Sequence, residues 1–165
     1  MTDMQTASWC GDLGALSDDQ LGLLTQCAIT VIAEGAGNDA EVDEIRELPA
    51  AVLAPDLAEA LREAGVPAAD EQIERLAEER TANRTLAIAL LEQICAVPAL
   101  RAEVDAAYTA KQRLMFADPV TIMAVGLVLL VMKLRRVKVG KDGLDVTLDP
   151  MQDVMANVIK SLLGG

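Results

Sequence analysis

The chain has no histidine, and its 165 residues include three cysteines and one residue each of tryptophan, tyrosine and phenylalanine. Without histidine it has neither a serine–histidine–aspartate triad nor the usual zinc ligands. The cysteines Cys10, Cys27 and Cys95 are far apart and form no Cys-x-x-Cys pair. We interpret Cys27 and Cys95 as small apolar core residues of a reduced cytosolic protein.

Basic charge is also scarce, since the net charge is −12 and aromatic residues are 2 % of the chain. Neutralising phosphates and stacking on bases supply most of the affinity for nucleic acids, so nucleic-acid binding is not expected. Residues 1–100 hold 19 acidic and 5 basic residues, whereas residues 101–165 hold 7 acidic and 9 basic residues. The core must be aliphatic, and a composition rich in alanine and leucine predicts a mainly helical protein.

The chain length fits one domain. The N-terminus has no basic region followed by an apolar run, so no secretory signal is predicted and the cytoplasm is the expected compartment. We expect a flexible N-terminal segment at residues 1–16 and a single helical domain at residues 17–165. Within that domain, residues 17–116 form an acidic helical part, and residues 117–165 form an apolar helix, a β-hairpin and a terminal helix.

Capping and breaking residues set the expected helix boundaries in the acidic part. Ser17 and Gln20 have the spacing of a capping box, which predicts a helix that ends near Glu34. The prolines Pro49 and Pro55 are then expected to divide the following region into short helices.

Gly65 is a predicted helix C-cap, and a long helix is expected from Asp70 to Ala96. The first half of this helix is highly charged, so we expect it to face solvent or a partner, whereas its second half belongs to the core. Pro98 begins a further helix, with Leu100, Val104, Tyr108 and Met115 about one helical repeat apart.

The longest apolar run follows Asp118-Pro119, a pair typical of a helix start, and extends uncharged from Pro119 to Met132. Its 14 residues span about 21 Å as a helix, less than the roughly 30 Å of a hydrocarbon layer. We therefore expect a helix buried by the others, with Gly126 marking close packing. The alternative is a membrane-associated, inner-membrane protein anchored by the apolar helix at residues 119–134, with the basic residues that follow at the lipid surface.

The residues after this run alternate between apolar and polar around Asp142-Gly143, which predicts a β-hairpin with a two-residue turn. The predicted pairs are Val139 with Val146, Val137 with Leu148, Lys138 with Thr147 and Arg136 with Asp149. Asp149-Pro150 then begins an amphipathic helix. The side chains expected to face inward are Met151, Val154, Met155, Val158, Ile159 and Leu162.

The sequence predicts no catalytic, cofactor-binding or metal-binding residue. Asp39, Glu41 and Asp43 are spaced like the first ligands of a calcium loop, but Glu44 replaces the required glycine and Ala50 replaces the bidentate acid. No enzyme activity and no cofactor are therefore predicted.

Two features of the C-terminal part favour partner binding. A two-stranded hairpin exposes two edges, so it must either pack on the helices or gain a strand from another chain. A cluster of basic residues is expected to contact the chain's own acidic half, another subunit or anionic lipid. The members of this cluster are Lys133, Arg135, Arg136, Lys138 and Lys141.

The segment KLRRVKVGKDGLDVTLD, from Lys133 to Asp149, follows the very apolar helix. Together they resemble the end of small effector-associated domains, which occur beside proteases, nucleases and other effectors in bacterial conflict systems. The resemblance implies a non-enzymatic adaptor that recruits or holds an effector. We therefore expect a protein-interaction or assembly module that binds a protein partner, a second copy of itself, or both, through its C-terminal half.

Overall fold

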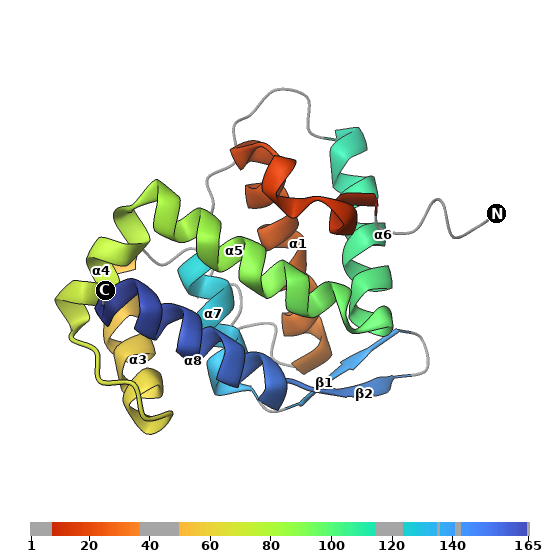
Figure 1. Cartoon of the computed structure of the whole chain (residues 1–165). Coiled ribbons are helices and arrows are strands. Elements are labelled where there is room, and N and C mark those ends of the chain that lie inside the picture. Colours follow the sequence, from red (N-terminus) through yellow and green to blue (C-terminus); the bar gives the residue numbers. More distant parts are fainter. Residues whose placement is uncertain (1–7, 37–49, 115–123, 135, 141–142, 165) are drawn as a thin grey trace.

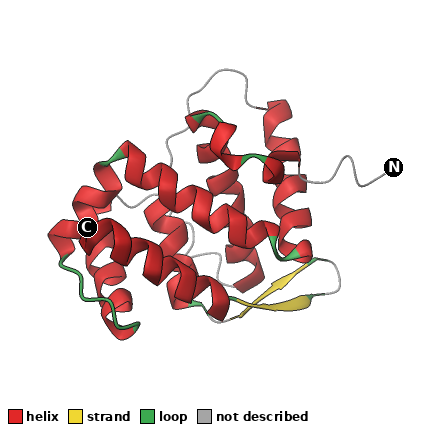
Figure 2. Cartoon of the chain, in the orientation of Figure 1, coloured by secondary structure: helices red, strands yellow, loops and turns green. Residues whose placement is uncertain are grey.

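The computed structural model describes residues 8–36, 50–114, 124–134, 136–140 and 143–164 (Figure 1). Most of these residues are helical, and the two strands form one antiparallel hairpin (Figure 2). The fold class predicted from the sequence is confirmed: a mainly α bundle with a C-terminal hairpin and a final helix.

The elements follow one another along the chain with short connections. In order they are the 3-10 turns η2 (Ser8–Gly11) and η3 (Leu13–Ala15), α1 (Asp18–Ala36), α3 (Ala50–Glu63), α4 (Asp70–Glu78), α5 (Arg80–Cys95), α6 (Pro98–Leu114), α7 (Ala124–Lys133), β1 (Arg136–Val139), β2 (Leu144–Thr147) and α8 (Asp149–Gly164). Helix α7 contacts α1, α3, α5 and α8. It therefore lies at the centre of the bundle.

The apolar character of α7 explains its central position. Leu127, Val128 and Val131 have no exposed surface, and Gly126 is buried as predicted. The helix start expected at Asp118-Pro119 lies outside the described residues. Within the described part of the chain, no single helix has both the length and the apolar character of a membrane span. Helices α5 and α6 pass that test as a pair, with a bend of 120° between them.

Helix α1 begins with the predicted capping box. The Ser17 N–H donates to Oε1 of Gln20 (2.9 Å), and the Gln20 N–H donates to Oγ of Ser17 (3.2 Å). The helix continues past the predicted end at Glu34 and includes Gly35 in its last turn. A glycine does not end a helix when the surrounding packing holds it in helical conformation.

The break predicted at Pro55 is wrong, because α3 runs through this proline. Pro55 is exposed, so the helix carbonyl that loses its N–H partner can be solvated. The predicted C-cap is confirmed: Gly65 has φ +87°, and the Val66 N–H donates to the carbonyl of Leu61 (2.8 Å), as in a Schellman motif.

The single helix predicted from Asp70 to Ala96 is two helices, with a break at Glu79, where ψ is 119°. The buried side chain of Asn83 explains the break. Its Nδ2 donates to the carbonyls of Ala77 and Glu79, the latter at 3.0 Å, so backbone groups freed by the break find a partner. A local pattern of helix-forming residues does not reveal this tertiary contact.

The N-terminal segment differs from the expectation of a flexible region at residues 1–16. Residues 8–15 form two 3-10 turns, and the side chains of Trp9 and Leu13 are buried. A disulfide joins Cys10 to Cys95, at the end of α5. The interpretation of Cys95 as a reduced core residue is therefore wrong, whereas Cys27 is buried in α1 as expected.

The hairpin forms at the predicted place, but its register differs from the prediction by two residues. Val139 pairs with Leu144 and Val137 pairs with Val146, so Gly140–Gly143 forms a longer loop. Both loop glycines have positive φ, 79° and 62°, which glycine adopts without steric cost. A shift of two residues keeps every side chain on its face, so the valines remain inward.

Helix α8 covers α5 and α7 with its apolar side. Met151, Met155 and Ile159 are buried as predicted. Leu162 is 37 % exposed, which corrects its expected inward position. It lies in the last turn of α8, beside Leu76 and Ala82 at a shallow hollow rather than in the core.

Candidate interaction site

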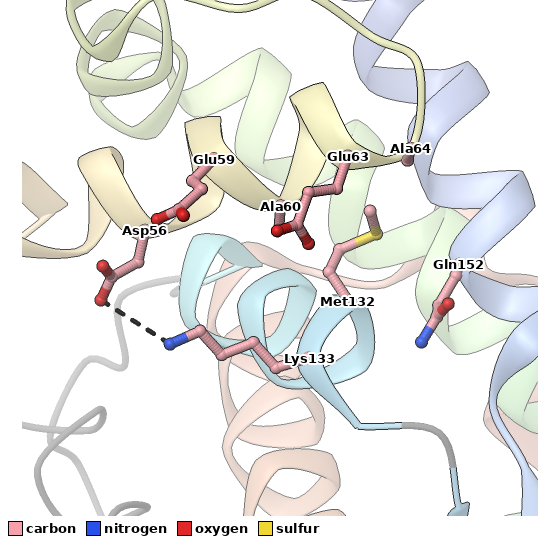
Figure 3. Close-up of a pocket in the computed structure, with 8 residues that line it drawn as sticks. All are labelled: Asp56, Glu59, Ala60, Glu63, Ala64, Met132, Lys133 and Gln152. Atoms are coloured by element: carbon pink, nitrogen blue, oxygen red, sulfur yellow. Dashed lines mark ion pairs between the residues drawn. The ribbon is translucent and has the colours of Figure 1, made fainter.

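The structure separates the predicted basic cluster into two groups; Arg135 and Lys141 lie outside the described residues. Lys133 ends α7 and points towards α3, where its Nζ is 3.9 Å from Oδ2 of Asp56 (Figure 3). Arg136 and Lys138 lie on β1 with exposed side chains. Lys133 thus contacts the chain's own acidic half, whereas Arg136 and Lys138 face outward.

A hollow of about 480 Å³, which we call the acidic groove, surrounds Lys133 (Figure 3). Its lining residues are Asp56, Glu59, Ala60, Glu63, Ala64, Met132, Lys133 and Gln152. The three acids of α3 share one helix face because they recur at three- and four-residue spacing. Lys133 and Asp56 are 53 % and 54 % exposed, so their ion pair contributes at most about 1 kcal/mol.

Gln152 of α8 fixes one wall of the acidic groove. Its Nε2 donates to the carbonyl oxygens of Val131 (2.9 Å) and Leu134 (2.7 Å). These carbonyls lie at the end of α7, where the helix supplies no N–H partner. Among the described residues, no group of three or more aspartate, glutamate, cysteine or histidine side chains is placed to hold a metal ion.

The outer face of the hairpin carries the second group of basic residues. Lys138 lies opposite Asp145, and Arg136 lies opposite Thr147. A directly opposed lysine and aspartate contribute roughly 0.2–1 kcal/mol. Neither Arg136 nor Lys138 makes an ion pair with the part of the chain that the structure describes. Arg136 therefore keeps its charge available on the hairpin surface.

The two strands have different surroundings. β1 contacts α1, α6 and β2, whereas β2 pairs with β1, and no other described strand joins it. Leu144 at the start of β2 is 57 % exposed, more than any other large hydrophobic residue among those described. The hairpin lies at the margin of the bundle, away from α3 (Figure 1). Exposed backbone and an exposed leucine therefore occur together on β2.

The charged region at the start of α5 faces neither solvent alone nor a partner, contrary to expectation. Arg80 and Arg84 both bind the carboxylate of Asp18, and Arg84 does so at 2.9 Å. The hydrogen bond from Arg80, supported by Arg84, holds the pKa of Asp18 below its ordinary value of 3.8. These arginines attach the N-terminal segment to α5.

Sequence reasoning missed two parts of this surface. The acidic face of α3 was hidden because Pro55 was expected to interrupt the helix, although Asp56, Glu59 and Glu63 have helical spacing. The contact between α1 and β1 was not recognised either, although the glycine in the last turn of α1 is a signal of close approach. The acidic run at 39–44, rejected as a calcium loop, lies outside the described residues.

Comparison with known proteins leaves the site to be interpreted from its own chemistry. No protein family, curated protein or solved structure matches the chain.

Proposed function

We propose that this chain is a non-enzymatic assembly module that binds another protein chain through its β-hairpin, in the first place a second copy of itself. One observation carries the proposal: within the described residues, β1 is held by α1 and β2, whereas the outer edge of β2 has no partner strand. Backbone N–H and C=O groups at such an edge favour pairing with an added strand.

The attachment of β1 to the bundle makes the hairpin a rigid platform. A β-carbon at Gly35 of α1 would collide with the carbonyl oxygen of Lys138, so the helix and the strand backbone are in close contact. Val137 and Val139 are buried beneath the strand. Because the hairpin is already ordered, a partner strand can bind without paying for its folding.

The surface of the hairpin also suits self-association of an acidic protein. The chain has a net charge of −12, and Arg136 and Lys138 are exposed without an ion pair among the described residues. Positive charge at the contact reduces the repulsion between two acidic copies and speeds their encounter. Pairing would also cover Leu144, which removes apolar surface from water.

Charge selects the register of such a pairing. Two antiparallel β2 edges related by a two-fold axis place residues of one face opposite each other, so the axis passes through either Asp145 or Val146. An axis at Asp145 puts two carboxylates together, which is unfavourable. An axis at Val146 puts Asp145 opposite Thr147 of the partner subunit, and this is the register that we propose.

An adaptor role in a bacterial defence system rests on the resemblance of the segment from Lys133 to Asp149 to effector-associated domains. It extends the same proposal, because an adaptor needs a rigid surface that holds a second protein. A cytoplasmic location likewise remains a prediction from the sequence.

The proposal is tested by light scattering of the wild type and of a double variant, Arg136→Glu with Lys138→Glu, at low and at physiological salt. We expect the wild type to exceed the 17.5 kDa of one chain, and the variant to fall towards it, most clearly at low salt where screening is weakest. The matched control is Arg75→Glu with Lys160→Glu, which changes the net charge equally on exposed helix positions.

Equal association of the hairpin variant and the wild type at both salt concentrations would overturn the proposal, as would a wild type that stays monomeric. If the control variant loses association to the same extent, the effect is general repulsion rather than contact at the hairpin. Circular dichroism of both variants checks that their helical content is unchanged.

A further inference from the structure

The N-terminal segment, residues 8–17, lies along α5 and α6 like a strap, and we use that name for it. The strap has a polar attachment near α1. There Arg84 donates to the carbonyl oxygens of Gly14 (2.8 Å) and Leu16 (2.6 Å), while Arg80 and Arg84 bind Asp18 immediately after the strap. This end is also held by the buried side chain of Leu13.

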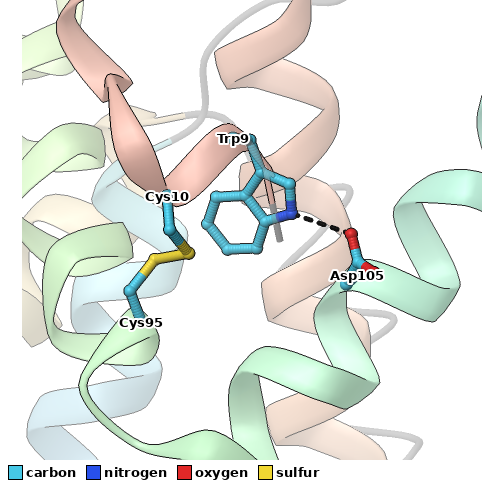
Figure 4. Close-up of a disulfide and its surroundings, with 4 residues drawn as sticks. All are labelled: Trp9, Cys10, Cys95 and Asp105. Carbon is cyan, nitrogen blue, oxygen red and sulfur yellow. Dashed lines mark hydrogen bonds between the residues drawn. A yellow bond between two sulfur atoms is a disulfide. The ribbon is translucent and has the colours of Figure 1, made fainter. Parts of the chain in front are cut away.

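The opposite end of the strap is attached by different chemistry (Figure 4). Cys10 forms a disulfide with Cys95 at the C-terminal end of α5, 85 residues further along the chain. The neighbouring Trp9 is 5 % exposed, and its Nε1 donates to Oδ1 of Asp105 on α6 (3.1 Å). The disulfide is thus the single covalent attachment of the strap among the described residues.

Reductants have access to this bond. Cys10 and Cys95 are both partly exposed, whereas Cys27 is fully buried. A partly exposed disulfide is open to attack by a thiolate, and buried cysteines are inert to the same reagents. Exchange chemistry is therefore directed to the strap and not to the third cysteine.

We propose that the Cys10–Cys95 disulfide is a thiol–disulfide exchange site whose reduction releases the N-terminal end of the strap. A thiolate of a dithiol reductant attacks one sulfur to form a mixed disulfide and expel the other cysteine as a thiolate. The second thiol of the reductant then closes its own disulfide and frees the first cysteine. Two electrons and two protons pass to the chain, which leaves two cysteine thiols.

Release follows from what remains after reduction. Residues 8–12 would then be held by the burial of one indole ring and by the hydrogen bond from Trp9 to Asp105. Ordering about five residues of backbone costs more than these two interactions return. The two 3-10 turns meet at exposed Asp12, and a β-carbon at neighbouring Gly11 would meet no atom within 4 Å, so the end can move without a clash.

The other end stays attached, because Arg84 and its carbonyl partners do not take part in redox chemistry. Reduction therefore changes a local part of the fold and leaves the bundle intact. This behaviour is expected of a redox-sensing disulfide in a reducing compartment. The inference is independent of the proposed role of the hairpin.

The chain supplies its own reporter, since Trp9 is its sole tryptophan. The experiment treats the full chain with dithiothreitol, counts accessible thiols under native conditions, and records tryptophan emission and cleavage by chymotrypsin. We expect two accessible thiols, an emission shift to longer wavelength and new cleavage after Trp9, all reversed by reoxidation. Far-ultraviolet circular dichroism should remain unchanged.

Two variants sharpen the test. Cys10→Ser with Cys95→Ser should give the emission and cleavage of the reduced wild type, with no response to dithiothreitol. Cys27→Ser should respond like the wild type. The proposal is overturned if the native protein resists reduction, or if two thiols appear while emission and cleavage stay unchanged. Because the reduced wild type gives the same readouts, the test does not depend on the folding of the serine variant.

Discussion

Gly35 in α1 and Lys138 in β1 are in backbone contact, and a β-carbon at residue 35 would collide with the Lys138 carbonyl oxygen and lie 3.1 Å from Cβ of Val137. This contact joins the hairpin to the helix bundle. Since the hairpin is a marginal unit alone, its order depends on this attachment.

Substitution of Gly35 by alanine should therefore separate α1 from β1 and lower the free energy of unfolding by about 1–3 kcal/mol, the usual cost of overpacking. Urea titration measures the change. Gly11→Ala is the control, because a β-carbon there meets no atom within 4 Å and its effect should stay within about 0.5 kcal/mol. Equal stability of the two variants would show that the helix and strand can move apart freely.

The break between α4 and α5 should depend on Asn83. Replacing it by alanine leaves the carbonyls of Ala77 and Glu79 without the amide donor, which should cost about 1–3 kcal/mol of unfolding free energy. Thermal or urea unfolding provides the measurement. The exposed Thr85, which bonds to a helix carbonyl of the same helix, is the control: Thr85→Ala should change stability by less than about 0.5 kcal/mol.

Asp18 should make the stability of the chain depend on pH. Because Arg80 and Arg84 lower its pKa below 3.8 in the folded chain, the charged carboxylate stabilises the fold above that pH. This contribution disappears as the pH falls through the lowered value. The stability difference between the wild type and Asp18→Asn should thus be largest near neutral pH and shrink below about pH 4.

Urea titrations of both proteins at several pH values check this expectation. A variant background with Arg80→Met and Arg84→Met should remove the pH dependence of the difference, because the charges that shift the pKa are gone. A difference that persists or grows in acid would contradict the assigned ion pairs.

Local sequence signals predicted the parts of the fold that local interactions determine. The capping box at Ser17 and the C-cap at Gly65 depend on neighbouring residues, and both form as expected. The apolar run predicted the central helix because few other positions could bury it. The face of each hairpin residue was also predictable, since alternation fixes it regardless of register.

The remaining features depend on contacts between distant residues. The break at Glu79 needs the amide of Asn83, and the disulfide joins cysteines 85 residues apart. The hairpin register depends on a loop in which both Gly140 and Gly143 have positive φ, whereas the sequence favoured a shorter turn. No local pattern encodes these choices.

The candidate site shows the same division. Arg136 and Lys138 were predicted to be exposed on alternate positions of a strand, and they are. The pairing of Lys133 with Asp56 depends on the packing of α7 against α3, so the sequence left it among several alternatives. The strap was missed because the N-terminal segment lacks a helical or strand pattern.

Hydrogen exchange of the β2 backbone at low and high protein concentration tests the proposed assembly most directly. A partner strand on the outer edge of β2 would protect amides there, so exchange in the peptide spanning Leu144–Thr147 should slow as the concentration rises, while exchange in α8 should stay constant. Exchange in β2 that is independent of concentration, or slowing confined to the acidic groove on α3, would contradict assembly through the hairpin.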